Sequence, residues 1–334
     1  MPKRALSPTF VQILGMTYEE RIKEYALANE EVVVMTAENR ALIRNLPPIL
    51  GPRLIDTGIT EQTMIGAAAG LALRGRKPIV HALGAFLTMR AFEFVRTDVG
   101  ISGLPVKLSS FVPGFLSDGN GPTHQAIEDV ALMRGIPGMQ VFSPADNEDM
   151  LLMLQAIWDS PKPAYLRVNT RPSVVPHQPF EMGKAECIQP GTDVALLCHG
   201  MLLEQAVEAR NLLQQQGLSA GLWNMRSLVP FDTELVLELA AKGIPMVCIE
   251  DHFQIGGLYS ILAETLLANS QTAKALPISL NQRWFKPGLL SEVLRYEGFS
   301  PEQMAGRVLE FLGMQPNEAL KALVSKIQEN TFDE

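Results

Sequence analysis

The sequence predicts an α/β protein of two domains, each a parallel sheet between two layers of helices. At 334 residues the chain is long enough for about two domains, and 47% hydrophobic residues give each one a buried core. Short apolar runs alternate with helical patterns, and such alternation is typical of parallel strands covered on both faces. Four prolines between residues 171 and 190 interrupt both patterns and indicate a domain boundary.

The first domain has six predicted strands with helical patterns between them. The strands are expected at residues 31–36, 54–56, 78–82, 106–111, 139–142 and 164–168. Ligands of such sheets gather at the carboxyl ends of the strands. Glu61, Phe86 and the loop that ends at His124 each follow one of these strands, so we expect three distant segments to meet at one edge of the sheet.

The second domain starts after the proline-rich stretch and repeats the alternation. Strands are expected at residues 193–198, 220–225 and 245–250, and helices at 202–215, 233–242 and 258–268. We therefore predict domains at residues 1–175 and 191–334, joined by a linker over residues 176–190. The residues from Pro316 onward have the pattern of an amphipathic helix.

The composition argues against several classes of protein. The formal net charge of −8 makes a nucleic-acid partner or an anionic membrane surface unfavourable, because neither attracts an acidic protein. No run approaches the roughly 20 apolar residues of a membrane span, and the first residues lead into no signal-peptide core. The three cysteines are far apart and form no Cys-x-x-Cys pair, so we interpret them as reduced thiols. We expect a cytoplasmic protein.

Glu61 is the most informative residue of the chain. Residues 54–56 form a predicted strand, Thr57 and Gly58 its turn, and residues 60–73 an almost wholly apolar helix, so Glu61 lies in the first helical turn. A glutamate at this place can simply complement the helix dipole. Its interpretation therefore depends on the segments that accompany it.

Three segments form a set: Gly58-Ile59-Thr60-Glu61-Gln62, Ala85-Phe86-Leu87-Thr88 and Asp118-Gly119-Asn120-Gly121-Pro122-Thr123-His124-Gln125. Together they resemble the pyrimidine-binding half of transketolases, which are thiamine-diphosphate enzymes that transfer two-carbon ketol units. The likeness continues through residues 127–134 and 143–146. The second domain resembles the transketolase C-terminal domain at residues 224–226, 230–232 and 250–257. The resemblance implies a pyrimidine-binding domain followed by a transketolase-type C-terminal domain.

The resemblance also implies a role for single residues. Glu61 matches the family's glutamate, whose carboxyl group hydrogen-bonds N1′ of the aminopyrimidine and favours the tautomer in which the cofactor's amino group acts as a base. Phe86 matches the ring that stacks on the aminopyrimidine, and Leu83 replaces a second ring. His124 matches a histidine that reaches the substrate and can pass protons near neutral pH. Glu38 replaces an aspartate at the place where the two cofactor-binding modules meet.

Other substrate positions depart from the family. Val112 stands where transketolases have a histidine, and Asn120 where they have an aspartate. The serine and arginine with which transketolases hold a sugar phosphate fall near Leu42 and near residues 15–16 here. Arg171 is left as the candidate anion contact, and Arg40 and Arg44 are near in sequence but have no assigned place. The apolar Val112 suggests a donor with a methyl group, such as pyruvate, and thus transfer of an acetyl unit in place of a ketol unit.

The sequence lacks the Gly-Asp-Gly motif of the module that binds the pyrophosphate through Mg²⁺. The resemblance therefore implies the second subunit of a split transketolase, a transferase that is active only with an N-terminal transketolase-like partner carrying Gly-Asp-Gly. That partner would bind the pyrophosphate and the magnesium ion of thiamine diphosphate. The expected assembly is an α₂β₂ heterotetramer, acting on small sugars or 2-oxoacids.

Three alternatives stay open at this point. The β subunit of a 2-oxoacid dehydrogenase also lacks the pyrophosphate module, but its loops lack Gly-Pro-Thr-His. A half that resembles 1-deoxyxylulose-phosphate synthase would use glyceraldehyde phosphate as its acceptor. A non-catalytic partner would regulate or scaffold a complete transketolase, since a fold alone does not guarantee chemistry.

Overall fold

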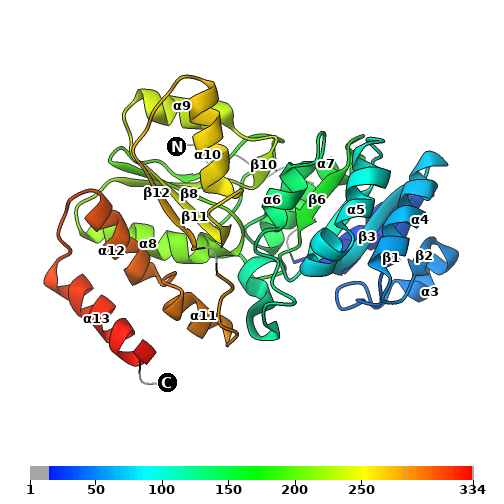
Figure 1. Cartoon of the computed structure of the whole chain (residues 1–334), viewed down its shortest axis with the longest axis horizontal. Helices are drawn as coiled ribbons and strands as arrows, with labels where there is room; N and C mark the ends of the chain where they lie inside the picture. The colour runs from blue at the N-terminus through cyan, green and yellow to red at the C-terminus, as the bar shows by residue number, and fades with distance from the viewer. Residues whose placement is uncertain (1–14, 282, 333–334) are drawn as a thin grey trace.

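The computed structural model describes residues 15–281 and 283–332, so the first residues of the predicted first domain lie outside the described part (Figure 1). A seven-stranded sheet has the order β10-β5-β6-β4-β3-β1-β2. All its pairs are parallel except the antiparallel pair of β10 and β5. Its strands are β1 (Val32–Thr36), β2 (Leu54–Asp56), β3 (Lys77–Leu83), β4 (Lys107–Phe111), β5 (Gln140–Phe142), β6 (Ala164–Arg167) and β10 (Ser227–Val229).

Helices cover both faces of this sheet, which explains why its strands are apolar on both sides. Alternate residues of β1 belong to two separate hydrophobic clusters. Val33 and Met35 pack in the cluster of α4, whereas Val32 and Val34 pack in that of α2 and α7. The helices and short 3₁₀ or π turns are α2 (Tyr18–Ala28), α3 (Pro47–Leu50), η1 (Gly51–Arg53), α4 (Glu61–Leu73), η2 (Phe86–Arg90), α5 (Phe92–Phe94), η3 (Val95–Gly100), η4 (Gly114–Asn120), α6 (Asp129–Arg134) and α7 (Asn147–Asp159).

The second sheet has five strands in the order β12-β11-β8-β9-β7, parallel except for β7, which pairs antiparallel with β9. Helices α8 and α12 lie on one side of it and α9 and α10 on the other (Figure 1). Its elements are β7 (Glu186–Gln189), β8 (Val194–Cys198), η5 (Gly200–Leu202), α8 (Leu203–Gln215), β9 (Ala220–Asn224), α9 (Thr233–Ala241), β11 (Met246–Phe253), α10 (Leu258–Ala268), β12 (Ala275–Leu280), α11 (Leu290–Tyr296), α12 (Pro301–Phe311) and α13 (Glu318–Phe332).

The predicted fold of two α/β/α domains is confirmed, with corrections of detail. Both sheets are mixed, because each carries one antiparallel edge strand. Strands β7, β10 and β12 were not predicted, and β7 lies inside the stretch expected to be a linker. The helix that follows the His124 loop begins at Asp129. None of the described helices is both long and apolar enough to cross a membrane. The domain boundaries themselves stay a prediction.

His177 bridges two buried carboxylates at the junction of the two sheets. Its Nδ1 lies 2.8 Å from Glu186 Oε2 on β7, and its Nε2 lies 2.7 Å from Asp146 Oδ2, the cap of α7. Burial alone would lower the pKa of His177, but the hydrogen bonds to both carboxylates and the charges of Asp149 and Glu186 outweigh burial and raise the pKa to about 10. The imidazolium is therefore a charged link between the domains.

We predict that His177→Gln lowers the free energy of unfolding by about 3–5 kcal/mol near pH 6, because it leaves buried carboxylates without their cation. The pKa of His177 is higher in the folded chain than its usual 6.5, so this stabilisation is fully present below pH 6.5 and is lost as the pH rises toward 10. Denaturant unfolding of both proteins at pH 6, 8 and 10 measures the difference. His124→Gln, in a partly exposed loop, is the control. Equal stability of wild type and His177→Gln at pH 6 would refute the bridge.

Gly84 lies directly after β3 and leaves no room for a side chain. A Cβ at this position would lie 2.7 Å from Ser110 Oγ on β4 and 2.8 Å from Ala126 Cβ in the loop after His124. Both neighbours are buried. The close approach holds the start of the turn that contains Phe86 against that loop.

We predict that Gly84→Ala destabilises the chain by about 1–3 kcal/mol, because the added methyl group overpacks a filled site. Gly70→Ala is the matched control. A Cβ at Gly70 meets no atom within 4 Å, and alanine in a helix interior is favoured over glycine by about 1 kcal/mol. The control should therefore be at least as stable as wild type in denaturant unfolding. Two substitutions with the same effect would contradict the packing argument.

Candidate functional site

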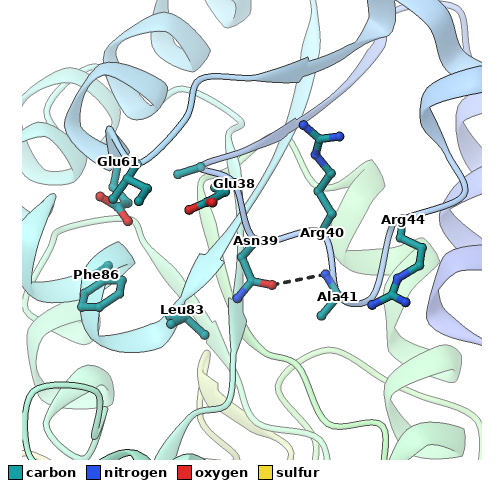
Figure 2. Close-up of a pocket in the computed structure, with 10 residues that line it drawn as sticks. Glu38, Asn39, Arg40, Ala41, Arg44, Glu61, Leu83 and Phe86 are labelled. Atoms are coloured by element: carbon teal, nitrogen blue, oxygen red, sulfur yellow. Dashed lines mark hydrogen bonds between the residues drawn. The ribbon is translucent and has the colours of Figure 1, made fainter.

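A cavity of about 430 Å³ opens beyond the carboxyl ends of β1, β2 and β3, the edge at which the sequence places its candidate residues. Three segments line it, one after each strand. Figure 2 shows Glu61 and Phe86 on one side of this cavity and Arg40 and Arg44 on the other. The lining residues are Ala37, Glu38, Asn39, Arg40, Ala41, Arg44, Ile59, Glu61, Leu83 and Phe86.

Glu61 is the first residue of α4, and its side chain is only 2% exposed. The helix behind it is apolar, with Met64, Ile65 and Ala68 fully buried. A carboxylate in such a place needs a partner, and Arg90 Nη1 supplies it by donating a hydrogen bond to Glu61 Oε2 at 3.0 Å. Glu61 thus brings a paired carboxylate to the cavity wall, next to the apolar side chains of Leu83 and Phe86.

Phe86 lies across the cavity from Glu38 and beside two charged or titratable groups. The guanidinium carbon of Arg90 lies 4.0 Å from the centre of the Phe86 ring. The ring of His124 meets Phe86 edge to face, with ring centroids 5.0 Å apart. The structure thus brings together Glu61, Phe86 and His124, which are far apart in the chain.

The loop after β1 is held in a fixed conformation at the cavity. Glu38 has a φ of 69°, an unusual value for a residue with a side chain. Its N–H donates to Asp56 Oδ1 at 3.0 Å, and Arg40 Nε donates to Asp56 Oδ2 at 2.7 Å. The hydroxyl of Thr36 donates to the carbonyl of Asn39 at 2.8 Å. These bonds fix the loop at the cavity and hold the Arg40 guanidinium against Asp56.

Four predicted substrate residues lie outside the cavity wall of this chain. His124 contacts Phe86, which lines the cavity, but is not itself part of the wall. Val112 follows β4 and has a φ of 47°, and Asn120 is exposed at the end of η4. Arg171 Nη2 donates to Glu204 Oε2 on α8 at 2.6 Å. Their contacts with substrate stay predictions.

Several residues of the site were missed by the sequence analysis. Arg90 was not considered, although it lies four residues after Phe86 and such spacing places two side chains near each other on a helix. Arg40 and Arg44 were noted but not placed, and the structure puts both on the cavity wall. The conformation of a loop depends on distant partners such as Asp56, and no local pattern gives it.

One cluster has the residue types of a metal site. Ligand atoms of Asp149, His177 and Glu186 lie within 4.8 Å of one another. However, Asn224 Nδ2 donates to Asp149 and Glu186, at 2.8 and 3.1 Å, and Arg226 Nη1 donates to Asp149 at 2.7 Å. A protonated His177 has no lone pair for a metal. The cluster is thus a neutralised network that links the domains.

Comparisons with known proteins agree with this architecture. A model described as the transketolase pyrimidine-binding domain matches residues 14–172, and one described as the transketolase C-terminal domain matches residues 183–304. The 6-deoxy-6-sulfo-D-fructose transketolase subunit of Clostridium sp. (strain MSTE9) is 36% identical over 76% of this chain and 80% of its own length. One of the subunits of the apulose-4-phosphate transketolase of Phocaeicola vulgatus is 28% identical over 89% of this chain and 96% of its own length.

Among solved structures, a split-gene transketolase described as an inactive β4 tetramer matches with a TM-score of 0.79 and 30% identity, over 89% of this chain and 97% of that one. The 1-deoxy-D-xylulose-5-phosphate synthase of Synechococcus elongatus is 31% identical, but this chain spans about half of it, 48%. The matches to the two domains, in this order and over nearly the whole chain, show that the chain belongs to the transketolase family.

Proposed function

We propose that this chain is the pyrimidine-binding subunit of a split, thiamine-diphosphate-dependent transketolase, a transferase of two-carbon units that works with a separate partner. The observation that carries the proposal is the buried Glu61 carboxylate beside the Phe86 ring in one cavity. Two of the relatives are named as transketolase subunits, and the split-gene neighbour is titled an inactive tetramer. The given sequence has no Gly-Asp-Gly, which supports a separate subunit for the pyrophosphate.

The residues present fit the aminopyrimidine of thiamine diphosphate. Phe86 offers a flat apolar surface for stacking, Leu83 adds a second apolar contact, and Glu61 offers a carboxylate to a ring N–H. When bound, the cofactor supplies the carbon centre that carries the two-carbon unit between substrates. Glu38, on the loop after β1, would lie where the partner's module meets this one.

The chain's own residues would hold protons and exclude water. Glu61, buried against α4, would hold or release a proton at N1′ of the ring. His124, edge to face with Phe86 and partly exposed, would exchange a proton with a substrate hydroxyl. The diphosphate and Mg²⁺ would bind mainly to the partner, in a cytoplasmic α₂β₂ heterotetramer.

The basic side of the cavity favours substrates that carry an anion. Arg40 and Arg44 lie across the cavity from Glu61 in Figure 2. Arg40 is already paired with Asp56, so Arg44 is the guanidinium that would pair with a phosphate, sulfonate or carboxylate. The names of two relatives contain a sulfo-sugar and a sugar phosphate. A second candidate donor is pyruvate, which the apolar Val112 favours.

We predict that Glu61→Gln in the co-purified pair lowers the rate of two-carbon transfer by about 10²–10⁴-fold, because an amide cannot exchange a proton with the ring. Gel filtration should show the same assembly as wild type. Glu93→Gln, an exposed glutamate of α5, is the matched control and should keep full activity. The chain alone should show no transfer. A fully active Glu61→Gln pair would end the proposal.

The donor is tested with the same pair. We expect transfer from a ketose phosphate or sulfonate at a kcat/KM at least about tenfold above that from the corresponding neutral ketose, since only the anionic donors can pair with the Arg44 guanidinium. Pyruvate is measured in parallel by release of carbon dioxide. Turnover of pyruvate without turnover of any ketose anion would favour the acetyl-transfer candidate and contradict the expected donor class.

A further inference from the structure

Arg90 contacts both groups that are proposed to hold the aminopyrimidine. Its Nη1 donates to the Glu61 carboxylate at 3.0 Å, and its guanidinium carbon lies 4.0 Å from the centre of the Phe86 ring. Glu61 begins α4 and Phe86 begins η2, so one side chain ties two elements together at the cavity. The family resemblance assigned no role to this position.

The local backbone explains how one arginine reaches both groups. Residues 86–90 form a π turn, in which the N–H of Ala91 donates to the carbonyl of Phe86 at 3.1 Å. Such turns are rare and are frequent at functional sites. The turn is fixed at its start, because Gly84 packs against β4 and the hydroxyl of Thr88 donates to the Gly84 carbonyl at 2.8 Å. Phe86 and Arg90 thus lie at the two ends of one rigid turn.

The position of Arg90 relative to the cavity decides whether its side chain supports a bound ring or occupies the place of that ring. Among the described residues, Glu61 and Phe86 line the cavity and Arg90 does not. The Arg90 side chain is 39% exposed, whereas that of Glu61 is 2% exposed. Arg90 therefore contacts the pair from outside the cavity, and the space beside Glu61 and Phe86 stays open to a ring.

A planar cation is better suited than another side chain to contact a carboxylate and an aromatic ring at the same time. Guanidinium can donate to a carboxylate while its flat face lies over an aromatic ring. It also balances a carboxylate that would otherwise be buried without a counter-charge. Without it, the Glu61 side chain would be free to turn toward solvent or to bind other donors, and Phe86 would lose its neighbour on one face.

We propose that Arg90 is a positioning residue, which orients Glu61 and Phe86 for the aminopyrimidine of thiamine diphosphate. The inference rests on the proposed function, since it concerns how this chain receives that ring. Arg90 makes no contact with the ring itself and acts through the two residues it touches. Its loss should weaken binding of the cofactor and disturb the electronic state of the bound ring.

The test uses the co-purified pair with Arg90→Gln, Arg90→Lys and the control Arg96→Gln, an exposed arginine in η3. Thiamine diphosphate is titrated with saturating Mg²⁺, and the circular dichroism of the bound aminopyrimidine is followed together with its dissociation constant. Arg90→Gln should raise the dissociation constant about tenfold or more and change the dichroism band of the bound ring. Arg90→Lys keeps the charge beside Glu61 and should recover part of both. Arg96→Gln should equal wild type.

The outcomes separate the inference from the function on which it rests. If the wild-type pair binds no thiamine diphosphate, both the role of Arg90 and the proposed function are refuted. A wild-type pair that binds it, with Arg90→Gln binding equally well and giving the same band, overturns only the role of Arg90. Tighter binding by Arg90→Gln also overturns it, because that is the result expected of a side chain that occupies the ring's place. Thermal unfolding checks that each variant folds, and if Arg90→Gln does not fold, Arg90→Lys decides between these outcomes.

Discussion

A carboxylate removed from water at the edge of a sheet is the constraint around which this site is built. Glu61 is buried at the start of an apolar helix, so it needs a cation or a hydrogen-bond donor in every state of the protein. Arg90 meets that need in the chain itself. A ring N–H can then donate to Glu61 from the cavity side, and the Glu61 carboxylate has a partner before and after the ring binds.

The C-terminal domain contributes to this site by holding the loop of His124. Arg167 pairs with Asp129 of α6 at 3.0 Å and with Asp251 of β11 at 2.6 Å, all buried. The side chain of Gln125 donates to the carbonyl of Phe285 at 2.8 Å. These contacts hold the carboxyl end of the segment after β4 against the second domain. The position of His124 next to Phe86 thus depends on residues more than about a hundred positions away.

The convergence of Glu61, Leu83, Phe86 and Glu38 could be predicted because it follows from topology. β3, β1 and β2 are neighbours in one parallel sheet, so the residues after each strand must meet at one edge. Arg90 was missed because its role depends on a contact with Glu61 on another helix, and no spacing within its own segment indicates that contact. β10 was not predicted for a different reason. It has only three residues, and although it follows a strand of the second sheet, it pairs with β5 of the first sheet. The local sequence pattern does not indicate pairing with a strand of the other sheet.

In the proposed function the cofactor is divided between two chains, and the groups that this chain offers account for that division. It presents a carboxylate, an aromatic ring and apolar contacts, all suited to one heterocycle. These contacts must also offset the translational and rotational freedom that the whole ligand loses when it binds. Stacking and one charged hydrogen bond supply only part of that free energy. A partner that binds the charged diphosphate adds its contacts to the same ligand, and the two sets together bind far more tightly than either alone. The cofactor then contacts both subunits and stabilises their association, because whatever binds only the assembled state shifts the equilibrium toward it.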